Sequence, residues 1–154
     1  MEVGIRMVEN EMTIKFKAIG VNESFARVCI AAFMASLNPT IDELGDVKTA
    51  VSEAVTNCVV HAYPHKEGEI EMYAKIKDNQ LYIRIKDYGV GIENIEKARQ
   101  PFYTTKPSKE RSGMGFTVME GFMDSVEVLT NVGFGTTIEM TKNIGCSLSF
   151  VCGV

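Results

Sequence analysis

The sequence predicts a two-layer α/β sandwich in which helices cover one face of a mixed, mostly antiparallel sheet. Segments that alternate apolar and polar residues are expected strands, and segments with apolar residues every three or four positions are expected helices. They follow one another in the order β-α-α-β-β-loop-α-β-β, with two pairs of strands joined by short turns. The chain has 154 residues, so we expect one domain at residues 8–142 with flexible termini at 1–7 and 143–154.

The first half of the chain predicts one strand followed by two helices. Residues 12–18, MTIKFKA, alternate like a strand, and Asn22 is placed to cap the first helix. Thr40 is placed to cap a longer helix that ends at Pro64. The first helix is expected to bury Phe25, Val28, Cys29, Ala32 and Phe33. The apolar stripe of the second helix consists of Leu44, Val47, Val51, Ala54, Val55 and Cys58.

The second half predicts two hairpins separated by a long loop and a helix. Residues 69–77 and 80–86 alternate as strands on either side of an Asp-Asn turn. Residues 93–112 lose this periodicity and carry prolines, threonines and basic residues, which is a loop composition. A loop of this length in a compact domain is usually functional or disordered. Beyond it, the pattern predicts a helix at 114–123 and strands at 125–130 and 136–141 around the turn NVGFG.

Composition, charge and missing motifs exclude several kinds of function. The formal net charge of -4 provides no basic surface for a phosphate backbone, so we expect no direct contact with nucleic acid. No apolar run approaches the ~20 residues that span a bilayer, and the N-terminus lacks the apolar middle region of a signal peptide. Cys29 and Cys58 fall in apolar helical patterns, where a reduced thiol acts as a small hydrophobe. We therefore expect a cytoplasmic protein without membrane contact. The chain contains no Gly-Lys dipeptide and hence no Walker A loop.

A carboxylate and two pairs of glycines stand where a strand ends and where a helix begins. Gly89 and Gly91 follow Asp87 at the strand end, and Gly113 and Gly115 open the third helix. An acceptor-only carboxylate complements the amino group of adenine and rejects guanine. Glycines adopt positive φ and let a flat base approach closely, and the free amides of a helix N-terminus bind phosphates. The alternative is that these glycines only make turns.

Three polar residues form a row on the long helix. Glu53, Asn57 and His61 stand at i, i+4 and i+8, on a side that the apolar stripe does not cover. An amide oxygen at Asn57 is a hard ligand suited to Mg²⁺, which takes its other ligands from water and phosphates. Glu53, one turn away, is placed to act as a general base. The alternative is a solvated polar face, and we assign no metal to His61 or His65.

Four ordered motifs together resemble the Bergerat, or GHKL, ATP-binding fold of DNA gyrase B, Hsp90, histidine kinases and the mismatch-repair protein MutL. They are E-x-x-x-N on a helix, D-x-G-x-G after a strand, G-x-G opening a helix, and GFGTT before the last strand. The segments NESFARV, EAVTNCVVHAY, ARQPFYTTKP and ERSGMGFTVMEGFMDSV are similar to the anti-sigma-factor serine kinases of endospore-forming bacteria. This resemblance covers about residues 10–141. It implies a homodimer that inhibits a sporulation sigma factor when ATP is bound and phosphorylates a serine of an anti-anti-sigma partner.

The resemblance also implies a role for each residue that matches a motif. Glu53 is the expected catalytic base, Asn57 the Mg²⁺ ligand and Asp87 the adenine reader. Arg111 is the second expected catalytic residue, since cations in the ATP lid neutralise the γ-phosphate as it transfers. The other expected contacts to ATP or ADP come from Gly89, Gly91, Thr104, Thr105, Lys106, Gly113, Met114, Gly115, and Thr136 or Thr137.

Glu23 and Arg27 stand at i, i+4 on the first helix, on the face expected to lie opposite its buried stripe. An exposed ion pair contributes little to stability, so the simple alternative is a surface salt bridge. The resemblance implies instead that Arg27, with Glu23, docks the protein partners.

Two functions of other classes fit the same fold. One is a nucleotide-gated binding module, in which ATP only orders the lid and the partner surface. The other is a detached ATP-binding domain of a histidine kinase, which would place phosphate on a histidine. A serine kinase labels a serine of its partner, a histidine kinase domain labels a histidine, and the binding module labels no partner.

Overall fold

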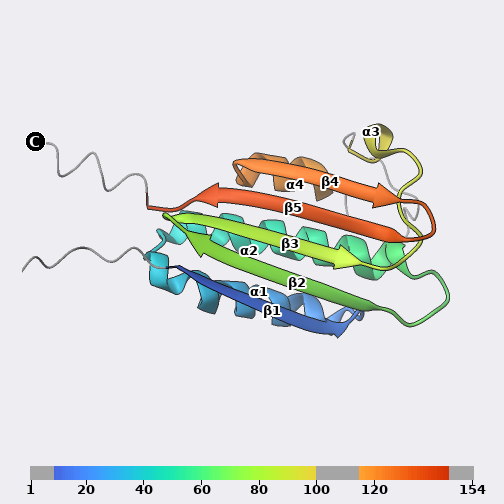
Figure 1. Ribbon diagram of the computed structural model, residues 1–154, viewed down its shortest axis with the longest axis horizontal. Helices are drawn as coiled ribbons and strands as arrows, with labels where there is room; N and C mark the ends of the chain where they lie inside the picture. The colour runs from blue at the N-terminus through green and yellow to red at the C-terminus, as the bar shows by residue number, and fades with distance from the viewer. Residues whose placement is uncertain (1–8, 100–114, 146–154) are drawn as a thin grey trace, which may run out of the picture.

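The computed structural model describes residues 9–99 and 115–145, which form a five-stranded sheet with helices on one face (Figure 1). The strand order is β1-β2-β3-β5-β4, and each of these neighbouring pairs is antiparallel. The predicted two-layer α/β sandwich is confirmed, with an antiparallel sheet where a mixed one was expected. The elements are β1 (Asn10–Lys17), α1 (Val21–Met34), η1 (Ala35–Leu37), α2 (Ile41–Asn57), η2 (Cys58–Ala62), β2 (Glu69–Lys77), β3 (Gln80–Asp87), α3 (Ile95–Ala98), α4 (Gly115–Phe122), β4 (Ser125–Asn131) and β5 (Gly135–Asn143).

The central hairpin of the sheet follows directly from the sequence pattern. Alternate residues of β2 and β3 point toward the helices and are buried, while the intervening residues face away. Asp78 and Asn79 join the two strands with φ of 52° and 62°, the left-handed conformation of a two-residue hairpin turn. The buried residues of this hairpin are Ile70, Met72, Ala74, Ile76, Leu81, Ile83 and Ile85.

Helix α2 is the central helix of the second layer and contacts both α1 and α4. Thr40 caps it as predicted: its Oγ1 accepts a hydrogen bond from the amide of Glu43 at 3.1 Å, and Glu43 Oε1 accepts one from the amide of Thr40 at 2.9 Å. After Asn57 the helix continues as the wider π turn of η2 and ends at Ala62, two residues before Pro64. Its fully buried residues are Val47, Ala50, Val51, Ala54 and Val55.

The buried face predicted for α1 is wrong in part: Cys29 and Phe33 pack against the core, but the other predicted residues are exposed. Phe25 and Val28 are 48% and 66% exposed, and Asn22 lies inside the helix, with Gly20 at the N-cap position. Because α1 meets the sheet and α2 along a narrow line, one row at i, i+4 and i+8 is buried and the larger neighbours lie at its rim. That row consists of Ala26, Ile30 and Met34.

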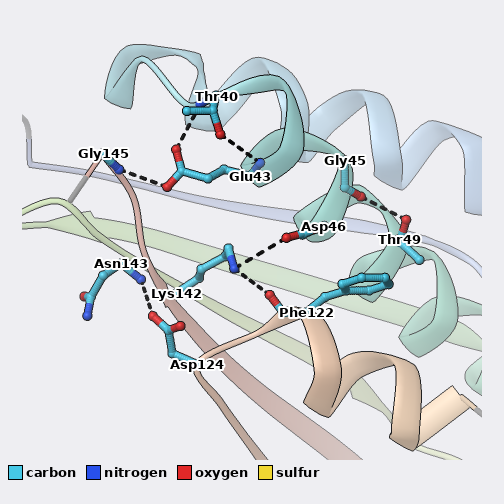
Figure 2. A network of polar contacts seen from close by, with 10 residues as sticks. All are labelled: Thr40, Glu43, Gly45, Asp46, Thr49, Phe122, Asp124, Lys142, Asn143 and Gly145. Carbon is cyan, nitrogen blue, oxygen red and sulfur yellow. Dashed lines mark hydrogen bonds and ion pairs between the residues drawn. The ribbon is translucent and has the colours of Figure 1, made fainter. Parts of the chain in front are cut away.

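One end of the sheet is fastened to the start of α2 by the last described residues (Figure 2). The amide of Gly145 donates a hydrogen bond to Glu43 Oε2 at 3.0 Å, and Ile144 is buried in the core. The fold therefore continues to at least residue 145, where the sequence predicted a flexible terminus from 143. The remainder of that predicted terminus, 146–154, and residues 1–7 lie outside the described part of the chain.

Three further contacts close the same end. Lys142 Nζ donates a hydrogen bond to the carbonyl of Phe122, the last residue of α4, at 2.6 Å, and lies 3.8 Å from Asp46 Oδ2 on α2 (Figure 2). The amide of Asn143 donates to Asp124 Oδ2 at 2.6 Å. We call this end of the sheet the fastened end. Its contacts are made by Thr40, Glu43, Asp46, Phe122, Asp124, Lys142, Asn143 and Gly145. Within the described ranges, no helix is long and apolar enough to cross a bilayer.

Candidate functional site

A cavity of about 570 Å³ lies at the opposite end of the sheet, where α2 and β3 end and α4 begins. This volume falls within the ~300–1,000 Å³ typical of small-molecule sites. Asn57 from α2, Asp87 from β3, Gly115 from α4 and Thr136 from β5 all line it. The helix carboxamide and the strand-end carboxylate, which the sequence predicts to share one cleft, therefore line one cavity.

Asp87 is an anchored, buried carboxylate in the wall of this cavity. It is 4% exposed, and its Oδ1 accepts hydrogen bonds from the amides of Gly89 at 3.0 Å and Thr136 at 3.2 Å. Its Oδ2 accepts a hydrogen bond from the thiol of Cys58 at 3.5 Å. Burial raises the pKa of Asp87, and these three donors act in the opposite direction. The result is a fixed acceptor, which is the group that an amino donor on a ligand requires.

The glycines after Asp87 let the chain pack closely against neighbouring backbone, and Gly91 has the positive φ that the sequence predicted. A Cβ on Gly89 would lie 2.0 Å from the carbonyl oxygen of Ala62, and one on Gly91, whose φ is +77°, would lie 2.6 Å from that of Asn131. The space at the Cβ position of both glycines is thus filled by protein backbone, and the close approach of a flat base to them stays a prediction. Their absent side chains let the segment after β3 pack against η2 and the β4–β5 turn. Gly91 also lines the cavity.

The first turn of α4 rests on the polar row of α2. A Cβ on Gly115 would lie 3.2 Å from both terminal atoms of the Asn57 side chain and 3.4 Å from Glu53 Oε2. Glu53 and Asn57 are both half-buried, and His61, the third member of the row, lines the cavity. The row faces α4 and the cavity, which excludes the alternative of a solvated polar face. A Cβ at this position would make the Asn57 and Glu53 side chains shift by a few tenths of an ångström.

The two threonines at the start of β5 point to opposite faces of the sheet. Thr136 is buried and lines the cavity, and its Oγ1 lies 3.0 Å from Thr130 Oγ1. Thr130 Oγ1 also accepts a hydrogen bond from the amide of Ile92 at 2.8 Å, which ties the loop after β3 to β4. Thr137 pairs with Lys86 on the open face of the sheet. Of the two, Thr136 is the one that reaches the cavity.

A single turn of helix, α3, interrupts the segment predicted as a loop from 93 to 112. Asn94 Oδ1 caps it by accepting a hydrogen bond from the amide of Lys97 at 3.0 Å, and both residues line the cavity. Four helical residues are too few to show a period in the sequence. The other predicted contacts, Thr104, Thr105, Lys106, Arg111, Gly113 and Met114, lie outside the described residues.

Glu23 and Arg27 lie on α1 and are not among the residues that line the cavity. Arg27 Nε is 3.4 Å from Glu23 Oε1, and that oxygen also accepts a hydrogen bond from the hydroxyl of Ser52 on α2. Glu23 therefore links the two helices, whereas the sequence predicted that it faces away from the packed side. Arg27 remains partly exposed, as a docking residue must be.

Sequence reasoning missed two residues that shape the site. Tyr63 accepts a hydrogen bond from the amide of Tyr88 at 2.7 Å and donates one to the carbonyl of Glu69 at 2.6 Å, which fixes the chain next to Asp87. Cys58 was predicted only as a small hydrophobe, yet it contacts the carboxylate. Its position directly after Asn57 was the available signal, because one step of about 100° turns a helix from its polar row toward the core.

The donors present fit a nucleotide with a divalent cation held mainly by its phosphates. In the described part of the chain, no three His, Cys, Asp or Glu side chains cluster as a metal site. The amide oxygen of Asn57 is a hard ligand at the cavity, and a single such ligand is typical where Mg²⁺ is held with phosphates and water.

The antiparallel sheet, the helix layer and this cavity define a histidine kinase-like ATPase domain, and the family model of that description matches residues 21–142. The chain is 52% identical over 141 residues to the Anti-sigma F factor of Bacillus licheniformis, covering 91% of this chain and 97% of that protein. It is 55% identical over 136 residues to the Anti-sigma F factor of Clostridium acetobutylicum, covering 88% and 95%. The chain belongs to the anti-sigma F factor family.

Solved structures show the same fold at low sequence identity. The RsbU and RsbW domains of a Mycobacterium tuberculosis protein match with a TM-score of 0.65 at 19% identity, covering 88% of this chain and 32% of that one. The catalytic domain of the histidine kinase ThkA matches with a TM-score of 0.55 at 14% identity, covering 86% of this chain and 96% of that one.

Proposed function

We propose that this chain is an ATP-dependent protein serine kinase that phosphorylates an anti-anti-sigma protein and, with nucleotide bound, binds and inhibits a sporulation sigma factor. The observation that carries the proposal is the single cavity lined by the Asn57 amide and the buried Asp87 carboxylate. The membership of the chain in the anti-sigma F factor family supports the regulatory part. The serine kinase and both protein partners go beyond these observations and are the part to be tested.

The proposed nucleotide lies with its base at Asp87 and its phosphates near the start of α4. Asp87 accepts a hydrogen bond from the adenine amino group, and Thr136 lies next to it. The amides of the first turn of α4, from Gly115, have no partner within the helix, and we propose that they bind phosphate oxygens. Mg²⁺, held by the Asn57 amide oxygen, would neutralise phosphate charge. We propose the remaining contacts for Thr104, Thr105, Lys106, Gly113 and Met114, with Gly89 and Gly91 as supports.

Glu53 acts as the base in the proposed transfer. Its carboxylate takes the proton of the partner's serine hydroxyl while the serine oxygen forms a bond to the γ-phosphorus. The bond between that phosphorus and the oxygen bridging to the β-phosphate breaks, and ADP leaves. We propose that Arg111 stabilises the negative charge on the transferring group. Glu53 is half-buried and its carboxylate lies next to Gly115, where we propose that phosphate binds, which supports this role.

We further propose that the partners dock on α1 through Arg27 and Glu23, and that the working unit is a cytoplasmic homodimer. Arg27 is 40% exposed and its carboxylate partner is bound to Ser52, so the ion pair is held in a fixed place on the surface. A fixed exposed guanidinium is well suited to a carboxylate on a partner protein.

Incubation of the protein with ATP labelled on the γ-phosphate, Mg²⁺ and a candidate anti-anti-sigma protein tests the function. We expect acid-stable label on a serine of the partner in the wild type, and none with Glu53→Gln, which should still bind ATP and the sigma factor. Wild-type binding of both ligands without any label would instead support a nucleotide-gated binding module. Acid-labile label on a histidine would support a histidine kinase domain.

A further inference from the structure

Cys58 is buried beside the carboxylate in the wall of the cavity. It is the first residue of η2, and its Sγ lies 3.5 Å from Asp87 Oδ2. Both residues line the cavity. An apolar side chain of similar size would fill the same space but would remove this donor from Oδ2.

The hydrogen bonds of Asp87 are divided between its two oxygens in a way that gives the thiol a distinct task. Oδ1 accepts the amides of Gly89 and Thr136, which cannot move without moving the backbone that carries them. Oδ2 accepts the thiol of Cys58, so this third contact adds to the two amides in resisting rotation of the carboxylate plane about its Cβ–Cγ bond. A carboxylate oxygen has two lone pairs, and a weak donor on one of them leaves the other for a ligand.

We propose that Cys58 is a positioning residue for Asp87: its thiol holds Oδ2 in the orientation that meets the amino group of a purine in the cavity. This inference rests on the proposed function, since it gives Cys58 a part in adenine recognition. It also separates Cys58 from Cys29, the half-buried thiol of α1, which is not among the cavity-lining residues.

The protonation of the pair suits this role. The thiol is the protonated, hydrogen-bond-donating form of Cys58, and it meets the carboxylate at 3.5 Å. Burial raises the pKa of Asp87, while the thiol hydrogen bond favours its ionised form. Removal of the thiol should therefore raise the pKa of Asp87 further.

Other titratable groups surround the pair and must stay constant in any comparison. Tyr63 follows η2 and interacts electrostatically with Asp87, and β5 contributes the uncharged Thr136. The remaining titratable or charged side chains that line the cavity are His61, Glu93 and Lys97. Because none of them changes between variants at Cys58, a difference in pH profile reports the thiol contact.

The test compares Cys58→Ala and Cys58→Ser with the wild type, and uses Cys29→Ala as the matched loss of a thiol away from the cavity. Calorimetry measures ADP and ATP affinity from about pH 5 to pH 8, and NMR follows the Asp87 carboxyl carbon without nucleotide. We expect Cys58→Ala to weaken binding about three- to fivefold at neutral pH, as for the loss of one modest hydrogen bond. In this variant, the loss of nucleotide affinity on acidification should begin at a higher pH, together with the titration of Asp87. Cys58→Ser, with a stronger donor, and Cys29→Ala should keep wild-type affinity.

Wild-type affinity and an unchanged dependence on acid pH in both Cys58 variants would overturn the inference. An equal loss of nucleotide affinity in both variants, with an unchanged dependence on acid pH, would mean that Cys58 only fills space. This result would also overturn the inference. If the wild type bound no adenine nucleotide, the proposed function would fail together with the recognition role. The Asp87 titration would then still show whether the thiol contact exists, so the two failures are distinguishable.

Discussion

The two ends of the sheet use buried and half-buried polar groups in opposite ways. At the fastened end, Glu43 and Lys142 contact protein groups on several elements. At the cavity end, Asp87 is held by three donors but still lines an open space. Helix α2 and strands β3 and β5 run through both ends (Figure 1). One end of the sheet is thus held together by contacts between protein groups, and the other presents a buried carboxylate to a cavity on the same helix and strands.

The largest expected effect is at the cavity end, from Asp87→Asn. This change replaces one acceptor oxygen of Asp87 with an NH₂ group, which is a donor. That group would face either the Cys58 thiol or the amides of Gly89 and Thr136, all of which are donors as well. We expect adenine nucleotide affinity to fall about 100-fold, as for loss of a hydrogen bond to a charged group, with sigma-factor binding lost in parallel. Calorimetry with ADP measures the first effect. Wild-type affinity in this variant would show that Asp87 does not read the base.

Glycine-to-alanine substitutions at the two ends should have opposite signs. A Cβ on Gly89 would lie 2.0 Å from the Ala62 carbonyl oxygen, so Gly89→Ala must displace backbone at the cavity, at a cost of about 1–3 kcal/mol in unfolding free energy. Gly45 in α2 has nothing within 4 Å of its Cβ position, and alanine there should stabilise by about 0.5–1 kcal/mol through helix propensity. Urea denaturation compares the two.

Gly45→Ala also serves as the control for nucleotide affinity. It should bind ADP like the wild type, whereas Gly89→Ala should bind it more weakly, because the displaced segment carries Asp87. Equal and small changes in stability at the two positions would contradict the close packing of the segment after β3.

At both ends of the sheet, the sequence predicted the contacts between residues that are close in the chain and missed those between distant residues. The capping box of Thr40 and the hairpin of β2 and β3 depend on residues close together in the chain, so local chemistry predicts them. The hydrogen bond from the Gly145 amide to Glu43 joins residues that are 102 positions apart in the sequence, and no local pattern predicts it. The same holds for the Gly89 contact with Ala62.

The cavity was predicted in part because its polar residues disobey the local patterns. Asn57 is an amide in the interior of a helix, and Asp87 is a carboxylate at a position where the alternation of the strand calls for an apolar residue. Both therefore stand out in the sequence. Cys58 does not stand out, because a buried thiol satisfies the same apolar pattern as the core of α2. The face of α1 was predicted wrongly in part because apolar residues lie around most of that helix, and only the packing against α2 selects Ala26 as part of the buried row.

Glu43→Ala should weaken the fastened end without affecting the cavity. The change removes the side-chain half of the capping box and the acceptor of the Gly145 amide, at a cost of about 1–2 kcal/mol. ADP affinity should stay within twofold of the wild type, because Glu43 lies at the opposite end of α2 from Asn57. Thermal unfolding and calorimetry on one sample measure both. A large loss of ADP affinity would mean that the two ends are coupled through α2.

The smallest expected effect is a difference in how the two ends respond to acid. Burial tends to raise the pKa of Glu43, but hydrogen bonds from Thr40 and Gly145 and the charge of Lys142 together lower it. Its native state therefore binds fewer protons than the unfolded chain, and the stability that it contributes is present above its unfolded pKa and lost as pH falls through the lower native value. Asp87 has a raised pKa, mainly through burial, so its native state binds more protons and its ionisation costs stability as pH rises through the native value.

Urea midpoints measured between about pH 3 and pH 6 separate these two contributions. Relative to the wild type, Glu43→Gln should lose less stability as pH falls, because it has no charge to lose in that window. Asp87→Asn should lose more, because it lacks the group whose protonation partly offsets acid unfolding. Since the pKa shifts have opposite signs, the two variants should deviate from the wild-type curve in opposite directions. Deviation in the same direction would show that burial does not dominate at Asp87, and that its hydrogen bonds make it as stabilising when ionised as Glu43.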